Sequence, residues 1–354
     1  MSIESPSRPV LSVVIVNYRS TERLRRCLAS IACKTSVLHE VIVVDNASPG
    51  FSARWFREIE PGVMLVESPC NQGFAGGVNL GLRYCRGEYV ALLNPDSELV
   101  NDALDRMVAF LRAHRRCGIA GARITYPPDA VLPDEQTPSV SAGEAETERL
   151  QISCGRFLTL GWLVAEHFGL RARFPRRFGG YVYAGWDRSS SRRVDWVSGS
   201  ALCARRELLA RHRGLDPRYF MYCEEQDLCF AAAREGWHTV FLADVLVRHY
   251  EGGSSEQAAG ESLVVRRLLL AEFARSQWLF LRKSYGRLSG AGAKSLLVTA
   301  FALRAAKWLL SSAGGVVARD RKAATGACRR ARAFGTVATR ILVAAPPTSG
   351  TPAQ

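Results

Sequence analysis

The sequence lacks paired cysteines. Its ten cysteines are scattered, and no two of them form a Cys-x-x-Cys pair, so the close spacing that is typical of a zinc site is missing. Several lie inside apolar stretches, where a thiol packs as a small hydrophobe. We therefore expect no zinc site and a protein that works in the reducing cytosol.

Targeting and membrane-spanning patterns are missing as well. The N-terminal stretch MSIESPSRPV has no charged region followed by an apolar one, so we expect no signal peptide. The longest charge-poor run near the C-terminus, 295–303, is bounded by Lys294 and Arg304 and provides about half of the ~20 residues that a spanning helix needs. We do not expect a transmembrane helix.

The common nucleotide-binding fingerprints do not occur. No Gly-Lys-Ser/Thr is present, and the glycine-containing segment NQGFAGGVN (71–79) matches neither the dinucleotide nor the Walker spacing. This argues against a P-loop NTPase and an ordinary Rossmann dehydrogenase. The sequence also shows no recognised DNA- or RNA-binding motif.

The chain has an excess of positive charge. It carries 47 Lys+Arg against 33 Asp+Glu, a formal net charge of +14, with the excess in the second half. Such a field favours anionic partners, which include nucleic acid, phosphorylated substrates and an anionic membrane surface. The charge alone does not choose among them.

Through the first 125 residues, β-branched apolar runs alternate with helical patterns. Strands are predicted at 11–18, 40–46, 63–68, 89–95 and 118–125, with helices near 21–33, 51–59, 75–86 and 99–114. Strands that are apolar on both faces and separated by helices indicate an α/β fold with a mostly parallel central sheet flanked by helices.

Polar residues follow the ends of these strands. In open sheets of this kind, ligands bind beyond the carboxyl ends of the strands. The residues there are Asn17-Tyr18, Asp45-Asn46, Asn71 and Asn94 to Asp96. We therefore expect a polar edge on one side of the sheet.

The second half is less regular. The stretch 126–191 predicts an irregular region that covers or extends the sheet. A strand running into a helix is predicted at 194–207, a loop feeding a helix at 220–237, and another strand at 238–250. After Gly260 the chain reads as helical almost throughout.

Asp96 stands in the stretch LLNPDSELV (92–100), where an apolar strand stops at Asn94-Pro95. Asn-Pro-Asp makes a good turn, so Asp96 alone is explained without a ligand. His249, at the end of the last strand, is equally well explained as a hydrogen-bonded structural residue. The residues alone do not decide whether Asp96 and His249 bind a ligand.

Three carboxylates crowd the start of one predicted helix. Glu224, Glu225 and Asp227 lie within four residues, after three aromatic residues that we expect to be exposed, Tyr219, Phe220 and Tyr222. A helix N-terminus accounts for one or two acids. Three of them repel unless a cation, a proton or a donor group is near, so a functional site is an equal alternative.

Taken in order, these stretches resemble the inverting glycosyltransferase family two, of the GT-A fold, and within it the bacterial rhamnosyltransferase-like branch. The resemblance covers roughly 1–125 and 194–285. Its matching stretches are VIVNYRSTERLRRCLASI (14–31), VIVVDNAS (41–48), NQGFAGGVNLGL (71–82), YVALLNPD (89–96), VDWVSGSALCARRE (194–207), FMYCEEQDLCFAAAREGW (220–237) and HYEGGSS (249–255).

The resemblance implies a donor site in the first half of the chain. Asp45 would hydrogen-bond the nucleoside of the donor, and Asn17-Tyr18 would line the base pocket. The segment from Asn71 to Asn79, with Gly73, would close over the nucleotide-sugar. Asn94 would lie at the same donor site.

The resemblance also implies a metal and a base. Asp96 matches the last acid of the family's Asp-x-Asp and would hold Mg²⁺ or Mn²⁺ against the donor diphosphate, and His249 matches a position that in some relatives completes that site. Glu225 would be the general base, with Asp227 close by. Asn94 stands where relatives often carry an acid, and Glu225 replaces the more usual Asp.

The acceptor would be bound by Trp196, Ser198, Gly199 and Glu224, and shaped further by 126–193. By the same resemblance, 1–125 forms the nucleotide-sugar-binding half of a GT-A domain and 126–260 its acceptor-binding and catalytic half. A helical extension at 261–345 and a disordered tail at 346–354 complete the expected organisation.

The helical extension has two interpretations. In one, 262–286 and 293–312 pack on the catalytic domain or on another subunit. In the other they lie at a lipid headgroup layer, with aromatic side chains beside basic ones. The residues that suggest the second interpretation are Trp278, Phe280, Phe301 and Trp308 beside Arg282, Lys283, Arg304 and Lys307.

The function that this implies is metal-dependent, inverting transfer of a sugar, most plausibly L-rhamnose from dTDP-L-rhamnose. The acceptor would be a glycan or a polyprenyl-diphosphate-linked sugar of a bacterial surface polysaccharide, with the enzyme cytoplasmic and peripheral at the inner face of the membrane. A galactofuranosyl- or hexosyltransferase that uses a UDP-sugar is the alternative donor class. A non-catalytic protein that binds nucleic acid or anionic lipid is the alternative outside the enzymes. We expect no nucleic-acid partner, and a homo-oligomer stays open.

Overall fold

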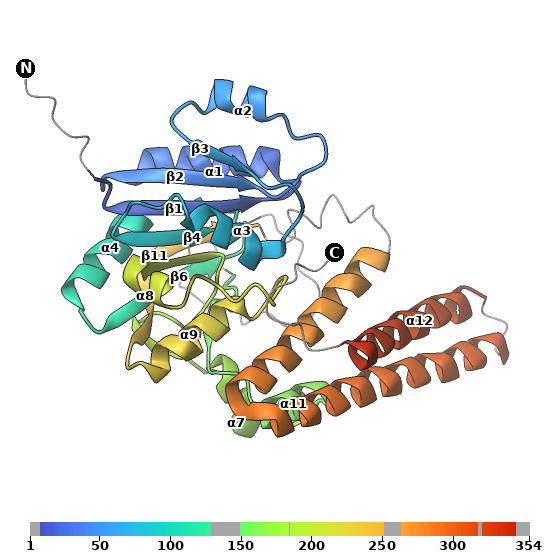
Figure 1. Cartoon of the computed structure of the whole chain (residues 1–354). Coiled ribbons are helices and arrows are strands. Elements are labelled where there is room, and N and C mark those ends of the chain that lie inside the picture. The colour runs from blue at the N-terminus through green and yellow to red at the C-terminus, as the bar shows by residue number, and fades with distance from the viewer. Residues whose placement is uncertain (1–7, 129–148, 184, 251–262, 318–320, 345–354) are drawn as a thin grey trace, which may run out of the picture.

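The computed structural model describes residues 8–128, 149–183, 185–250, 263–317 and 321–344. The expected disordered tail at 346–354 lies outside these residues, as do 251–255 of the last matching stretch. An α/β body carries a long helical hairpin on one side (Figure 1).

The first half alternates strands and helices, as predicted. The strands are β1 (Leu11–Asn17), β2 (His39–Asp45), β3 (Met64–Glu67), β4 (Tyr89–Leu93), β5 (Ser97–Leu99) and β6 (Cys117–Thr125). The helices are α1 (Thr21–Lys34), α2 (Ala53–Ile59), α3 (Gly73–Leu82) and α4 (Ala103–Ala113). The five predicted strands are confirmed, and the three-residue strand β5 stands where the prediction began a helix at residue 99.

The second half forms short elements and then long ones. The strands are β7 (Cys154–Gly155), β8 (Arg192–Val194), β9 (Trp196–Val197), β10 (Ala201–Arg205) and β11 (His238–His249). The helices are α5 (Leu160–His167), α6 (Leu170–Arg173), α7 (Pro175–Phe178), the 3₁₀ turn η1 (Gly179–Val182), α8 (Arg206–Arg211), α9 (Glu224–Arg234), α11 (Leu263–Val317) and α12 (Arg321–Val343). The prediction that the stretch 126–191 is irregular was therefore wrong where the helices α5 to α7 form.

One sheet runs through the α/β body in the order β3-β2-β1-β4-β10-β6-β11-β5, with β8 paired to β11. Strands β3, β2, β1 and β4 are parallel, and β6 pairs in parallel with β11. Strand β10 lies antiparallel between β4 and β6. The sheet is therefore mostly parallel, as predicted, with an antiparallel strand at its centre.

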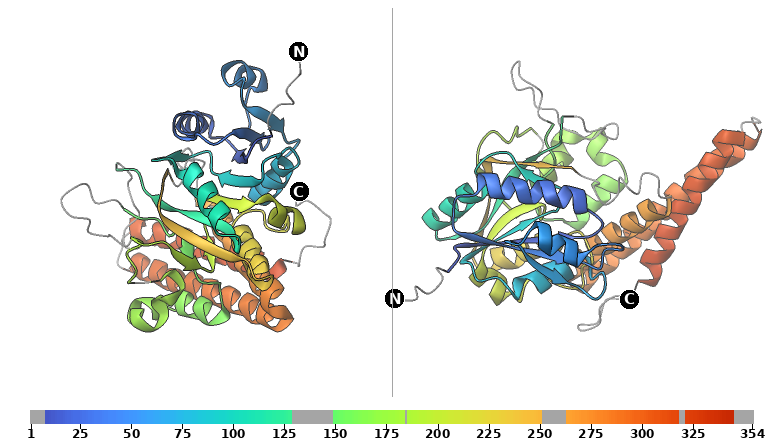
Figure 2. Two further views of the ribbon diagram at one scale, coloured as in Figure 1. Left: turned by 90° about the vertical axis from the view of Figure 1, so that its left-hand side faces the viewer. Right: turned by 90° about the horizontal axis from the view of Figure 1, so that it is seen from above.

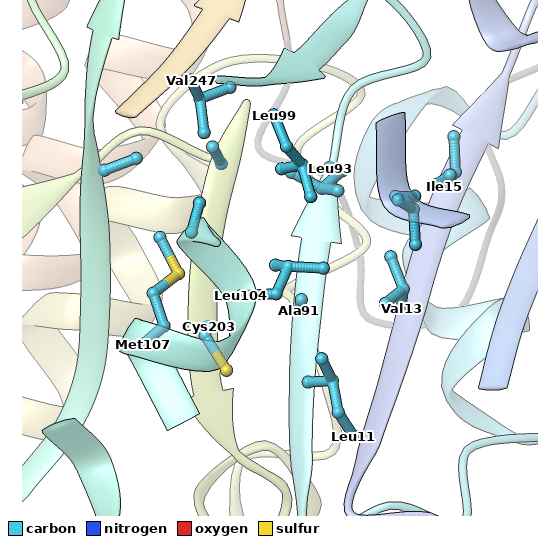
Figure 3. Close-up of a cluster of buried hydrophobic side chains, with 14 of the residues drawn as sticks. Leu11, Val13, Ile15, Ala91, Leu93, Leu99, Leu104, Met107, Cys203 and Val247 are labelled. Atoms are coloured by element: carbon cyan, nitrogen blue, oxygen red, sulfur yellow. The ribbon is translucent and has the colours of Figure 1, made fainter. Parts of the chain in front are cut away.

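Helices cover both faces of this sheet, as Figure 2 shows. On one face α1 and α4 pack on inward side chains of β1, β4 and β10, with Leu11, Ala91, Met107 and Cys203 among the buried contacts (Figure 3). On the other face α3, α8 and α9 bury a second set of side chains. Because parallel strands lie between two layers, their carboxyl ends are left as the open polar edge.

A hairpin of helices forms the C-terminal region. Helix α11 is broken at Gly286, which has φ 92°, and its second segment runs antiparallel to α12, since Lys294 contacts Ala344 and Phe301 stacks on Phe334. The hairpin has its own buried cluster, which includes Trp278, Phe280 and Phe301. For these three rings the interpretation that placed them at a lipid headgroup layer is therefore wrong, and the interpretation that the helices pack on the body is right, because the rings form the core that joins the hairpin to the body.

Candidate active site

Asp45 is held rigidly at the end of β2. Asn17 Nδ2, at the end of the neighbouring β1, donates to Asp45 Oδ1 at 3.0 Å, and the backbone N–H of Ser48 donates to Asp45 Oδ2 at 3.1 Å. Asn17 and Asp45 are both buried, and Tyr18 is half-buried at the mouth of this corner. The predicted donor residues of β1 and β2 thus lie together, with the carboxylate fixed in one orientation.

Asn46, beside Asp45, organises the glycine-containing segment. Its Nδ2 donates to Asn71 Oδ1 and to the Gly73 carbonyl, both at 3.0 Å, and its Oδ1 accepts from Gln72 N at 3.0 Å. The sequence placed Asn46 at the right strand end but gave it no role. Its buried amide connects the nucleoside corner to the start of α3.

The start of α3 packs directly on the loop that precedes α9. Gly73 has φ +71°, and a Cβ there would lie 2.1 Å from the Phe220 carbonyl oxygen. Phe74 N donates to that same oxygen at 2.7 Å. Asn79, further along α3, uses its amide on both backbone groups of Leu215 at 2.7 and 2.8 Å. Asn79 therefore ties α3 to the 215 loop, while Gly73 allows the close approach.

Asp96 and His249 meet where β4 and β11 end. His249 Nε2 lies 3.2 Å from Asp96 Oδ1 and 3.2 Å from Asn94 Nδ2. The backbone joins them as well, since Tyr250 N donates to Asp96 O at 2.9 Å. Two residues separated by more than 150 positions are thus brought to one point of the polar edge.

Gln151 fixes the orientation of His249. Its Nε2 donates to the His249 carbonyl at 2.7 Å, and its Oε1 faces His249 Nδ1 at 2.9 Å. Because a carboxamide oxygen only accepts, Nδ1 must carry the proton of this bond. The other ring nitrogen, Nε2, is then the one directed at Asp96, which is the arrangement that metal-binding histidines commonly have.

The Asp96 and His249 pair fits a weakly held divalent cation. It offers one carboxylate oxygen and one imidazole nitrogen, and in the described part of the chain no three His, Cys, Asp or Glu side chains gather into a metal cluster. Mg²⁺ and Mn²⁺ accept water and phosphate oxygens for their other positions. These two residues would therefore hold the ion together with a bound diphosphate.

The segment Ser198 to Ser200 lies between this pair and the acidic helix. Asn94 Nδ2 donates to Ser200 Oγ at 3.2 Å, and Ser198 Oγ donates to the same oxygen at 3.2 Å. On its other side Gly199 faces Phe74 and Glu225, and a Cβ at Gly199 would lie 3.8 Å from Glu225 Cβ. One short turn therefore borders both the expected metal residues and the expected base.

Glu224 and Glu225 begin α9; Glu224 is buried, and Glu225 is half-buried with its carboxyl oxygen Oε2 buried. Neither Glu224 Oε2 nor Glu225 Oε2 has a hydrogen-bond partner within the described residues. Burial raises the pKa of Glu225 to about 7, and burial together with the Glu225 charge raises the pKa of Glu224 well above its ordinary value. Glu225 is thus poised to take up a proton near neutral pH, as a general base must.

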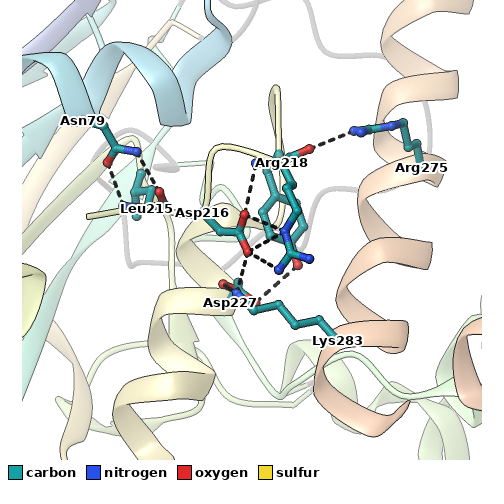
Figure 4. A network of polar contacts seen from close by, with 8 residues as sticks. Asn79, Leu215, Asp216, Arg218, Asp227, Arg275 and Lys283 are labelled. Atoms are coloured by element: carbon teal, nitrogen blue, oxygen red, sulfur yellow. Dashed lines mark hydrogen bonds and ion pairs between the residues drawn. The ribbon is translucent and has the colours of Figure 1, made fainter. Parts of the chain in front are cut away.

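Asp227, unlike Glu224 and Glu225, has partners on both carboxylate oxygens. Its Oδ2 lies 2.6 Å from Lys283 Nζ of α11, and its Oδ1 accepts from Tyr219 OH at 3.3 Å (Figure 4). Tyr219 is fully buried, so its expected exposure was wrong. Burial raises the pKa of Asp227, although Lys283 opposes the effect. With both oxygens engaged, Asp227 lies beside the expected base as a structural anchor.

The backbone just before α9 is strained and is held from α11. Tyr222 and Cys223 have φ 74° and 65°, a left-handed conformation that non-glycine residues rarely adopt. Ser276 Oγ donates to the Met221 carbonyl at 2.8 Å, and Arg275 donates to the Arg218 carbonyl at 3.1 Å. Contacts from the C-terminal region thus support the turn that presents the carboxyl groups.

Trp196, predicted at the acceptor site, has its indole ring buried. Its Nε1 donates to the Arg156 carbonyl at 2.8 Å, and the ring lies near that of Tyr181. Tyr181 OH in turn lies 3.2 Å from Gln226 Nε2 on α9. Trp196 therefore connects the region around α5 to α7 with the acidic helix.

The part of the chain that contains Asp45 and Asp96 matches a family model. Residues 12–155 match the family model described as Glycosyl transferase family 2. The chain contains a glycosyl transferase family 2 domain. Over 258 residues it is 28% identical to the N-acetylglucosaminyl-diphospho-decaprenol L-rhamnosyltransferase of Mycobacterium tuberculosis. The aligned region covers 70% of this chain and 78% of the relative.

Solved structures agree on the fold. A mannosyltransferase from Pyrobaculum calidifontis, in complex with GDP-Man and Mn²⁺, superposes with a TM-score of 0.52 at 17% identity, covering 96% of this chain and 91% of that one. GalNAc-T7 with UDP, GalNAc and Mn²⁺ gives a TM-score of 0.52 at 16% identity, covering 78% of this chain and 48% of that one. The fold is therefore GT-A-like, with a long helical C-terminal region.

The match to the glycosyl transferase family 2 model runs from β1 to β7. It includes Asp45, Asp96 and Gln151 but ends before Glu225 and His249. Sequence reasoning missed Gln151 and Lys283, because neither stands in a motif and each acts through a contact across 98 or 56 positions.

Proposed function

We propose that this glycosyltransferase moves a sugar from a nucleotide donor to an acceptor hydroxyl with inversion at the anomeric carbon, with Glu225 as the general base. The observation that carries the proposal is that one turn, Ser198 to Ser200, contacts Asn94 next to the Asp96 and His249 pair on one side. On its other side the turn borders Glu225, whose Oε2 has no hydrogen-bond partner within the described residues. Groups that can stabilise the leaving diphosphate therefore lie on one side of this turn, and a group that can accept the acceptor proton lies on the other.

The chemistry follows from these groups. The acceptor oxygen forms a bond to the anomeric carbon while the bond from that carbon to the diphosphate oxygen breaks and the electron pair leaves with the phosphate. Glu225 takes the acceptor proton, a contribution of about 10²–10⁴-fold in rate. A single displacement of this kind inverts the anomeric centre.

Asp96 and His249 would hold Mg²⁺ or Mn²⁺ at the donor diphosphate. When bound, such an ion supplies Lewis-acid stabilisation of the leaving nucleoside diphosphate. Asp45, with Asn17 and Tyr18, would bind the nucleoside, and the segment from Asn71 to Gly73 would cover the diphosphate. We propose Ser198, Gly199 and Glu224 for acceptor contacts.

We propose dTDP-L-rhamnose as the donor and a polyprenyl-diphosphate-linked sugar as the acceptor, at the cytoplasmic face of the membrane. The likeness to the Mycobacterium tuberculosis enzyme, named for L-rhamnosyl transfer to such an acceptor, supports this choice. In a panel of dTDP- and UDP-sugars with Mn²⁺, nucleoside diphosphate release should be fastest from dTDP-L-rhamnose. Release from a UDP-hexose alone would overturn the donor assignment and leave the base assignment standing.

A further inference from the structure

The second segment of α11 has an exposed apolar face. Leu303, Leu309 and Leu310 are 55%, 56% and 75% exposed. At helical spacing they belong to a stripe without a charged residue, called the outer face, which comprises Thr299, Ala302, Leu303, Ala306, Leu309, Leu310 and Ala313.

The outer face is not the side of α11 that packs on the protein. The opposite side buries Ala293, Leu297 and Phe301 against α12, which contributes Val337 and Ile341 to the same cluster. Figure 1 shows this hairpin extending away from the α/β body. A helix with one apolar side already packed and a second apolar side exposed has a surface left for a partner.

Charge indicates what that partner is. Between Arg287 and Ala344 the sequence has a single acidic residue, Asp320, against eleven Lys or Arg. Two exposed basic side chains of α11, Arg287 and Lys307, lie at helical positions on either side of the outer face. A second copy of so cationic a hairpin would repel the first, whereas an anionic surface would attract it.

We infer that the outer face of α11, with the basic side chains around it, docks on the surface of an anionic lipid bilayer, lying in the headgroup layer. Residues 267–313 are apolar enough to cross a membrane by length and composition. However, Gly286 breaks this stretch, and residues before the break, such as Trp278 and Phe280, are buried in the protein core. One apolar side with basic flanks is the pattern of an interfacial helix.

The docking surface connects to the site described above. The first segment of α11 contacts Asp227 through Lys283 and the strained turn through Ser276. Resting on the proposed function, a docked hairpin would hold the acidic helix at a fixed position relative to the bilayer. A lipid-linked acceptor is embedded in that same surface.

The test is binding of the full chain to vesicles that contain no sugar acceptor, so that its outcome is independent of turnover. Vesicles of phosphatidylglycerol with phosphatidylcholine should bind the protein in a flotation assay, and pure phosphatidylcholine should bind it at least about tenfold more weakly. The double variant Leu303→Gln/Leu310→Gln should lose at least about tenfold in affinity. Leu38→Gln, an equally polar change at an exposed leucine of the α/β body, is the matched control and should bind normally.

A second experiment tests how much the basic side chains contribute to vesicle binding. Arg287→Gln/Lys307→Gln should weaken binding by about fivefold for each charge removed, and binding should fall as salt rises. All variants should keep the wild-type melting temperature, since the changed side chains are exposed. Equal binding of Leu303→Gln/Leu310→Gln, no binding to anionic vesicles at low salt, or a dimer that this double variant abolishes would each overturn the proposal.

Discussion

Lys283 Nζ lies 2.6 Å from Asp227 Oδ2 and 2.7 Å from Asp216 Oδ2. One ammonium group from the C-terminal helices therefore joins the acidic helix α9 to the loop before it (Figure 4). Burial would raise the pKa of Asp216, but its contacts with Arg218 and Lys283 outweigh that effect and lower it. The C-terminal region is thus part of the support of the candidate active site.

Replacing Lys283 by Met should impair both stability and turnover. The change leaves the buried Asp227 carboxylate without its cation, at a cost of about 1–3 kcal/mol, since the lysine itself is partly exposed. Because the turn before α9 would loosen, kcat should fall more than the affinity for donor. Urea unfolding and steady-state kinetics check this, with Lys307→Met, an exposed lysine of the same helix, as the control. An unchanged kcat would show that Lys283 does not position the site.

Glycine at position 73 should be required for two separable reasons. Gly73→Ala adds a methyl group 2.1 Å from the Phe220 carbonyl oxygen and strains a backbone with φ +71°. Gly50→Ala is the matched control, because Gly50 has φ +76° and open space around its Cβ. The control should lose about 1–2 kcal/mol and keep donor binding. Gly73→Ala should lose more stability and also weaken donor binding, and equal losses in the two variants would argue against the close approach.

The cation should bind weakly until the donor is present. Asp96 and His249 supply only two ligands, and the rest must come from water and phosphate oxygens. Calorimetry should therefore show Mn²⁺ binding to the free protein at least about tenfold weaker than binding in the presence of a nucleoside diphosphate. Asp96→Asn should remove this difference. Tight binding of Mn²⁺ to the free wild-type protein would contradict the proposed site.

The pH dependence should report Glu225. Because its pKa is raised to about 7, kcat/KM should rise with pH up to about 7 and level off above it, as the base becomes ionised. The folded-state pKa lies above the ordinary value of 4.5, so its stabilising contribution is full below pH 4.5 and is lost as the pH rises through about 7. The difference in unfolding free energy between Glu225→Gln and wild type should therefore favour the variant more at pH 8 than at pH 5. Identical pH profiles of stability for the two proteins would argue against the raised pKa.

The sequence was sufficient to predict the first half of the fold, because the apolar runs of β1, β2, β4 and β6 can only be buried between helical layers. It also predicted that Asn17, Asp45 and Asp96 lie at the polar edge, since parallel strands end on one side of a sheet, whereas the pairing of Asp96 with His249 was implied only by the family resemblance. In the structure Asp45 lies beside Asn17, and Asp96 beside His249.

What the sequence could not predict depends on contacts between distant segments. Gln151 has no motif, and only the pairing of His249 with it reveals which ring nitrogen is directed at Asp96. Lys283 and Phe301 both stand in helices that mix apolar and basic residues. Periodicity predicted the helices but not which of their sides packs. Trp278, Phe280 and Phe301, which one interpretation placed at a lipid surface, are buried, and the exposed face consists of other residues.

The most direct test of the account is the rate of nucleoside diphosphate release by Glu225→Gln, measured with dTDP-L-rhamnose, Mn²⁺ and a polyprenyl-diphosphate-linked acceptor. Donor affinity should be followed in parallel by calorimetry. We predict a loss of about 10²–10⁴-fold in the rate of sugar transfer with donor binding retained, because the variant keeps the shape of the side chain and loses only its ability to accept a proton. Transfer at the wild-type rate by Glu225→Gln would contradict the assignment of Glu225 as the base.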